Sequence, residues 1–217
     1  MSLRRKAEVD MMAPDETLDP RRAMEMLEST SRESSRALRV DEGLLFGVWG
    51  VAWLVGYGAT YLSVRGQDPY TGPAAWAYAV MAAGFGLAVV VTTVVVTRAT
   101  RGVLGASATT GMLYGLSWPV AFATLFLLEG ALARAGAPDE VLGLVGAGGP
   151  ALVVGVIYLV GSAIWRSVTM FALGVWLCLA MVVGSYLGVV ALPAIMAVAG
   201  GAGFLVAGAA RLPRTRR

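Results

Sequence analysis

The sequence predicts an all-α membrane protein, a bundle of six transmembrane helices preceded by an amphipathic helix on the cytoplasmic side. The first observation behind this prediction is composition, because 57% of the residues are hydrophobic and 14% are charged, against about 25% charged in soluble domains. The second is that charge is segregated: residues 1–42 carry 18 of the 31 charged side chains, and residues 211–217 carry four arginines. The third is that the chain between them contains uncharged runs of about 20 residues, which are long enough to cross a hydrocarbon core.

Six such runs are separated by turn-forming or charged segments. "RGQDPYTGP", "RATRG" and "RAGAPDE" mark the first three breaks. A hairpin at Arg166 marks the fourth, since a lone charge within a membrane is costly. Gly188 and Pro193 mark the fifth break. Residues 141–148 either extend the fourth span or form a short surface or re-entrant piece. The predicted spans are 44–64, 74–97, 110–128, 147–165, 169–187 and 191–210.

The segment before the first span has two predicted parts. Residues 1–18 are expected to be a disordered cytoplasmic tail, and residues 19–42 an amphipathic surface helix with Asp19 as its N-cap. Arginines flank the apolar stripe of this helix, where anionic lipid headgroups can meet them. It either docks a partner or simply lies on the membrane or in solvent. The transmembrane domain is then 43–210, with a basic cytoplasmic tail at 211–217.

The arginines also predict orientation, because basic residues favour the cytoplasmic side of a membrane. With both termini in the cytoplasm, every inner loop is basic, and the outer loops contain Glu129, Asp139 and Glu140. We therefore expect a multi-pass protein of the cytoplasmic (bacterial inner) membrane. The basic pI near 9.3 is interpreted as a topology signal, so no nucleic-acid partner is expected. The arginines that could dock a cytoplasmic partner are Arg32, Arg36, Arg39, Arg98, Arg101 and Arg166.

The predicted spans lack the side chains that membrane catalysis uses. The chain has no histidine and no asparagine, and its one glutamine, Gln67, lies in a loop. Proteolysis, metal hydrolysis, haem ligation and proton relays need acids, bases or ligands within the membrane. We therefore expect no enzyme, no catalytic residue, no cofactor and no metal site. Glu129, at the outer end of the third span, remains a candidate functional carboxylate, or an interfacial carboxylate near Arg134.

Tryptophans form the second candidate site. Trp49, Trp53, Trp118 and Trp176 lie on spans that run in the same direction, each about 8–14 Å from the inner end at 1.5 Å per residue. One hypothesis is a cavity for an aromatic or cationic ligand. The alternative is that the rings fill space beside glycines. Glycines in the first, second and sixth spans permit close helix packing, either within the bundle or in a homo-oligomer.

Two resemblances concern the start of the chain. The "LLFGVWGVAWLVGYG" run, preceded by an arginine-rich helix that begins at "DP", resembles a group of small six-helix bacterial membrane proteins with no assigned activity, mainly over residues 19–64. The order of a surface helix before six spans is also superficially similar to the permease subunits of ABC exporters. That similarity implies that an inner loop at 97–111 contacts an ATPase.

Two functions remain after these exclusions. The first is a non-enzymatic membrane subunit, transport-associated or regulatory, that binds a cytoplasmic ATPase or regulator through the arginine-lined inner face. The alternative is a self-contained transporter or binding protein for a small apolar or cationic compound. The first is favoured, because the spans offer no chemistry for coupling an ion to transport.

Overall fold

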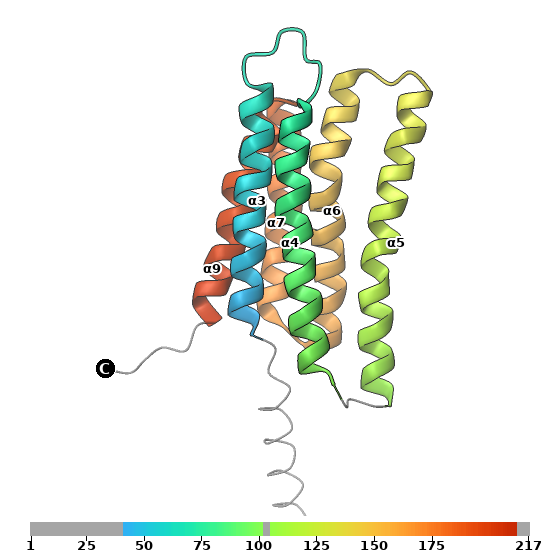
Figure 1. Cartoon of the computed structure of the whole chain (residues 1–217), viewed down its shortest axis with the longest axis vertical. Helices are drawn as coiled ribbons and strands as arrows, with labels where there is room; N and C mark the ends of the chain where they lie inside the picture. Colours follow the sequence, from blue (N-terminus) through green and yellow to red (C-terminus); the bar gives the residue numbers. More distant parts are fainter. Residues whose placement is uncertain (1–40, 102–104, 212–217) are drawn as a thin grey trace, which may run out of the picture. The chain divides into compact units, whose positions relative to one another are not determined.

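The computed structural model describes residues 41–101 and 105–211 as an all-α bundle (Figure 1). Within these residues, six helices, the sixth made of three consecutive segments, are long and apolar enough to cross a membrane. This confirms the six-span prediction and indicates a multi-pass membrane protein. The segments are α3 (Glu42–Val64), α4 (Ala75–Ala99), α5 (Ala106–Arg134), α6 (Asp139–Trp165), α7 (Val168–Leu187), α8 (Ala191–Ile195), the π-helix η1 (Met196–Gly200) and α9 (Gly201–Arg211).

The predictions for the tail at 1–18 and for the surface helix up to residue 40 lie outside the described residues, as does the basic tail beyond Arg211. The first described residue, Asp41, is the N-cap of α3, and its carboxylate accepts a hydrogen bond from the Leu44 N–H at 2.9 Å. Such a cap satisfies a backbone donor that the helix itself leaves free. The first span therefore begins at Glu42.

The third and fourth spans are longer than predicted. Helix α5 continues to Arg134, and α6 begins at Asp139, so residues 141–148 extend the fourth span rather than forming a separate piece. The prediction ended these spans early because Glu129, Asp139 and Glu140 interrupt the apolar pattern. Acidic side chains in the first turn of α6 are compatible with a helix, since they interact favourably with its positive N-terminal end.

The predicted hairpin at Arg166 is confirmed. Arg166 ends α6 in the left-handed conformation, with φ at 51°, and the Ser167 hydroxyl caps α7 by accepting from the Met170 N–H at 3.3 Å. The break after the fifth span falls at Gly188, whose φ of 107° is one that glycine adopts readily. Both turns therefore follow from residues that the sequence marks.

The sixth span is not one regular α-helix. Between α8 and α9 lies η1, a single π-helical stretch from Met196 to Gly200. Such stretches arise where a helix accommodates an additional residue, and they often occur at functional sites. The apolar pattern of the sequence did not predict it.

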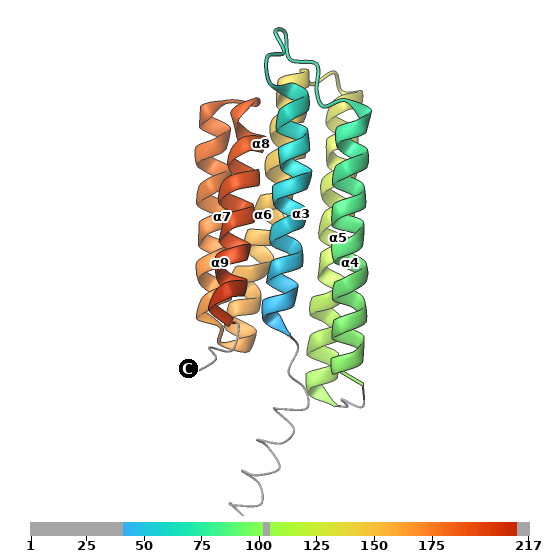
Figure 2. The same cartoon turned by 60° about the vertical axis from the view of Figure 1, so that its left-hand side comes forward.

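The helices pack unevenly (Figures 1 and 2). Helix α3 lies between α4 and the sixth span, α6 lies between α5 and α7, and the sixth span packs on α7. Helix α4 therefore packs mainly on α3, and α5 mainly on α6. The two are the edge helices of the bundle, and no residue of α5 is buried.

Glycines bring the inner helices together at several backbone contacts, among them Gly174 with Gly155, Gly201 with Gly50 and Gly208 with Gly43. A Cβ added to Gly174 of α7 would lie 2.8 Å from the carbonyl oxygen of Gly155 in α6. A Cβ added to Gly201 would lie 3.1 Å from the carbonyl oxygen of Gly50 in α3. Side chains at these positions would force the helices apart, so the glycines serve packing within the chain. Gly47 and Gly86, by contrast, face open space.

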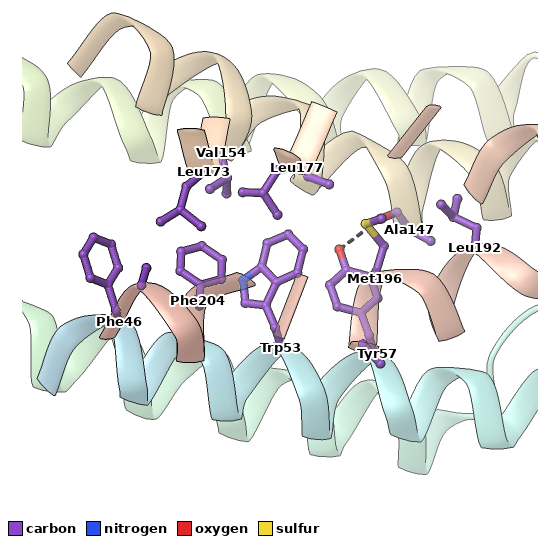
Figure 3. Packing of buried hydrophobic residues seen from close by; sticks show 13 residues of the cluster. Phe46, Trp53, Tyr57, Ala147, Val154, Leu173, Leu177, Leu192, Met196 and Phe204 are labelled. Atoms are coloured by element: carbon purple, nitrogen blue, oxygen red, sulfur yellow. Dashed lines mark hydrogen bonds between the residues drawn. The ribbon is translucent and has the colours of Figure 1, made fainter. Parts of the chain in front are cut away.

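Large apolar side chains fill the space between the inner helices (Figure 3). Trp53, Tyr57 and Phe204 are almost completely buried. The Tyr57 hydroxyl donates to the Ala147 carbonyl oxygen at 2.9 Å and so links α3 to α6. The buried cluster draws on every helix except the edge pair: Phe46, Trp53, Tyr57, Ala147, Ala151, Val154, Leu173, Leu177, Leu192, Met196, Ala197, Phe204 and Ala207.

Candidate functional sites

Trp53 lies at the centre of the bundle, where α3 faces the sixth span. Its side chain is 0% exposed, and its six-membered ring lies directly on Gly200, the last residue of η1. Ring centroids of Tyr57 and Phe204 are 5.1 and 5.5 Å away. In the described part of the chain, no acceptor lies within hydrogen-bonding distance of its Nε1. This indole N–H is an unsatisfied buried donor, which ordinarily costs about 1–3 kcal/mol.

Two of the other predicted tryptophans join Trp53 through intervening rings. Phe85 of α4 lies 5.9 Å from Trp49 and 6.1 Å from Trp53. On the other side, Tyr158 of α6 lies 5.9 Å from Phe204 and 5.8 Å from Trp118, with both pairs edge to face, a favourable aromatic geometry. We call this series the aromatic band: Trp49, Phe85, Trp53, Phe204, Tyr158 and Trp118.

Trp176 does not belong to the aromatic band. Its side chain is 48% exposed and lies on the outer side of the sixth span, over Gly203. The indole N–H donates to the Ala199 carbonyl oxygen of η1 at 2.8 Å. The π-helical stretch is therefore held between two indoles, Trp53 of α3 and Trp176 of α7.

The edge helix α4 is attached to the aromatic band by a hydrogen bond. Trp49 Nε1 donates to the Thr92 hydroxyl at 2.9 Å. Helix α5 has no equivalent among the described residues, since the hydroxyls of Thr110, Ser117 and Thr124 bond to carbonyl groups of α5 itself. Contact of α5 with α6 depends on side-chain packing instead.

Three of the six predicted docking arginines lie at one end of the bundle, which we call the Arg166 end. Arg98 is in the last turn of α4, Arg101 is in the turn that follows, and Arg166 ends α6. All three are exposed, at the end where α3 begins (Figure 1). Arg32, Arg36 and Arg39 lie outside the described residues.

Glu129 lies near the opposite end, which we call the Glu129 end. It belongs to the side of α5 that faces α6, with Trp118, Phe122 and Leu125 on the same stripe. Its carboxylate is packed against Gly146, since a Cβ added there would lie 2.7 Å from Glu129 Oε1. Arg134 follows five residues later, which places it about 140° away around the helix.

Sequence reasoning missed Tyr70. It lies in the loop between α3 and α4, yet its side chain is 8% exposed, and its hydroxyl lies against Gly143 of α6. Burial, followed by the nearby hydroxyl of Tyr78 and the carboxylates of Asp139, Glu129 and Glu140, raises the pKa of Tyr70 to about 12. A tyrosine beside proline and glycine is usual in a loop, so the sequence alone carried no signal that this ring is buried.

The described residues contain no group of three or more histidine, cysteine or acidic side chains that could hold a metal ion. Comparisons with protein-family models, with curated proteins and with solved structures gave no match to the chain. The candidate functional groups of the described residues are therefore those at the two ends of the bundle and in the aromatic band.

Proposed function

We propose that the protein is a non-enzymatic subunit of the cytoplasmic membrane, with both termini in the cytoplasm, that binds a cytoplasmic partner through the Arg166 end. The observation that carries this proposal is the gathering of Arg98, Arg101 and Arg166 at the end where α3 begins. Exposed arginines present fixed charges suited to carboxylate or phosphate groups. The partner is an ATPase or a regulator with an acidic surface.

The distribution of arginines supports the orientation in this proposal. The cytoplasmic side would hold Arg98, Arg101, Arg166 and the four arginines of 211–217, whereas the outer side would hold Arg65 and Arg134, as expected because basic residues favour the cytoplasmic side. A protease added to intact cells should therefore fail to reach a tag placed after Arg217. Cleavage of that tag would reverse the orientation, and the Arg166 end would then face away from the cytoplasm.

Partner binding is tested by affinity purification in mild detergent. The triple variant Arg98→Ala, Arg101→Ala and Arg166→Ala should lose a partner that the unaltered protein retains. The matched control is Arg65→Ala with Arg134→Ala, which removes arginines near the Glu129 end and should retain the partner. Recovery of the protein without any partner, in repeated preparations, would contradict the proposal.

A second candidate function rests on the unsatisfied Trp53 N–H within the aromatic band. A compound with an apolar body and one acceptor atom would satisfy this donor, and a cation would interact with the ring faces. The two functions separate in one experiment. Deletion of residues 1–40 should abolish partner binding and spare ligand binding. Leucine at Trp53 and Trp118, which both belong to the aromatic band, should do the reverse.

A further inference from the structure

The backbone of the α6–α7 turn has an unusual residue at its left-handed position. In the described part of the chain, every residue with a positive φ is a glycine except Arg166, whose φ is 51°. A side chain makes this conformation costly, because its Cβ lies too close to the backbone, whereas glycine adopts it freely. The turn therefore has an arginine where glycine would fold better. The glycines are Gly66, Gly72, Gly105, Gly136 and Gly188.

Contacts within the chain do not offset the cost of an arginine at this position. The Arg166 side chain is exposed, and among the described residues its guanidinium makes no hydrogen bond and no ion pair. The turn itself closes through the backbone, since the N–H groups of Arg166 and Ser167 both donate to the Ser162 carbonyl oxygen. The guanidinium is therefore free to bind a group outside the chain.

Arg166 is held more firmly than the other two arginines of the Arg166 end. Beside the turn, Met170 of α7 packs on Gly161 of α6, where an added Cβ would lie 2.6 Å from Met170 Cε. Arg98, by contrast, belongs to the edge helix α4, and Arg101 lies in the turn after it. A side chain on a fixed backbone loses less freedom when it binds, so it contributes more to affinity.

The chemistry of the guanidinium selects an acidic group as its partner. Arginine binds a carboxylate or a phosphate through two parallel hydrogen bonds. Lipid phosphates can meet any arginine at the membrane surface, whatever the backbone conformation beneath it. A protein presents its acidic side chain at one defined place, where a firmly held arginine is an advantage. The position of Arg166 thus favours a carboxylate of a protein over a lipid headgroup.

We propose that Arg166 is the principal binding residue of the Arg166 end, and that its guanidinium binds an aspartate or glutamate side chain of the cytoplasmic partner. Arg98 and Arg101 add solvent-screened charge around it. This inference rests on the proposed function, because it names the residue and the acidic group through which that partner is bound. Since the backbone conformation costs stability and the side chain serves binding, glycine at 166 should raise stability and lower affinity.

Thermal unfolding of the full chain in detergent tests the stability part. Arg166→Gly should raise Tm by about 2–4 °C, as expected for relief of a left-handed side chain in a chain of this size. Arg166→Ala keeps the Cβ and should change Tm by less than about 1 °C. The matched control is Gly136→Arg, which places arginine at the left-handed end of α5 and should lower Tm. An unchanged or lower Tm for Arg166→Gly would overturn the proposal.

Fluorescence anisotropy tests the binding part, on the full chain in discs of zwitterionic lipid. The probe is a labelled peptide of six glutamates, and a peptide of six glutamines is its matched control. Arg166→Gly should weaken binding of the glutamate peptide about tenfold, and Arg98→Ala about twofold to threefold, as expected for a hydrogen-bonded charge pair and for a screened charge. Arg166→Lys should give an intermediate loss, since lysine keeps the charge without the planar fork.

The outcomes separate this inference from the proposed function. Equal losses for Arg166→Gly and Arg98→Ala would leave a basic surface in place and overturn only the role of Arg166. Failure of the unaltered protein to bind the glutamate peptide would contradict an acidic partner and, with it, the proposed function. A rise in Tm in phosphatidylglycerol discs that Arg166→Gly abolishes, with peptide binding unchanged, would assign Arg166 to lipid headgroups and also overturn the inference.

Discussion

The inner helices and the edge helices of this bundle are held by different means. Helices α3, α6, α7 and the sixth span meet through glycine-to-carbonyl contacts and a buried aromatic cluster. Helix α4 packs closely on α3, where Phe85 and Met81 meet Gly56 and one hydrogen bond is added, but it has one main neighbour; α5 has no buried residue. In a membrane, lipid tails are as apolar as leucine, so helices associate through close packing and polar contacts rather than through the hydrophobic effect. Helix α5 has the least of both.

The largest expected effect is the loss of the central indole. Trp53→Ala should reduce the free energy of unfolding by about 3–5 kcal/mol, because it opens a cavity among side chains that cannot close around it. Thermal unfolding in detergent, with tryptophan fluorescence as the signal, measures this. Trp76→Ala is the control on edge helix α4, since Trp76 is half exposed at the start of that helix. A similar loss in both variants would remove the distinction between core and edge.

The next effect concerns the glycine contact between α6 and α7. Gly174→Ala should cost about 1–3 kcal/mol, the usual range for overpacking, because the new Cβ meets the Gly155 carbonyl oxygen. Gly111→Ala on α5 faces open space and should leave stability unchanged or raise it slightly, since alanine is the better helix former. The same unfolding measurement applies. Stabilisation by Gly174→Ala would contradict the close backbone approach.

A pair of leucines compares the two regions directly. Leu177 of α7 is fully buried, whereas Leu125 of α5 lies against Gly149 and stays partly exposed. Leu177→Ala should cost about 2–5 kcal/mol, and Leu125→Ala about 1 kcal/mol or less, since lipid replaces part of its contact. Chemical denaturation of both variants gives the two values. Equal values would show that α5 is as well packed as the core.

The smallest effect concerns the hydrogen bond that attaches α4. A double-mutant cycle with Trp49→Phe and Thr92→Val should give a coupling energy of about 0.6 kcal/mol, the usual value for hydrogen bonds between membrane helices. The control cycle pairs Trp49→Phe with Thr97→Val, because the Thr97 hydroxyl bonds within α4 itself and should show no coupling to Trp49. Coupling of similar size to Thr97 would argue against a direct Trp49–Thr92 contact.

The number of spans and the positions of the turns could be predicted from the sequence. The length of the apolar runs decides the number of spans. The cost of a buried charge places the turn at Arg166, and turn-forming residues place the turn at Gly188. Packing order did not follow, since neither α5, which lies at the edge, nor α7, which lies in the core, has a marked apolar face that would indicate its neighbours.

The candidate sites were predictable in part. Counting residues along the spans correctly placed Trp49, Trp53 and Trp118 at one depth. Depth does not say which side of a helix a ring occupies, however, and Trp176 lies outside the aromatic band. Glu129 faces α6 because it lies on the same side of α5 as Trp118 and Phe122. This could be predicted only if α6 were already known to be the neighbour of α5. Burial of Tyr70 depends on the shape of the α3–α4 loop, where the Gln67 side chain donates to the Gly72 carbonyl oxygen and accepts from the Thr71 N–H, and no periodic pattern encodes that shape.

The π-helical stretch also constrains the length of the sixth span. Removing one residue between Met196 and Gly200 would restore regular α-helical winding and leave the helix on either side close to its present register, because the wide turn holds the additional residue. Phe204 would then keep its place beside Trp53, and the change would fall on the contacts that η1 itself makes with Trp53 and with Trp176. The same deletion within α9 would turn everything beyond it by about 100° and would disturb the bundle more.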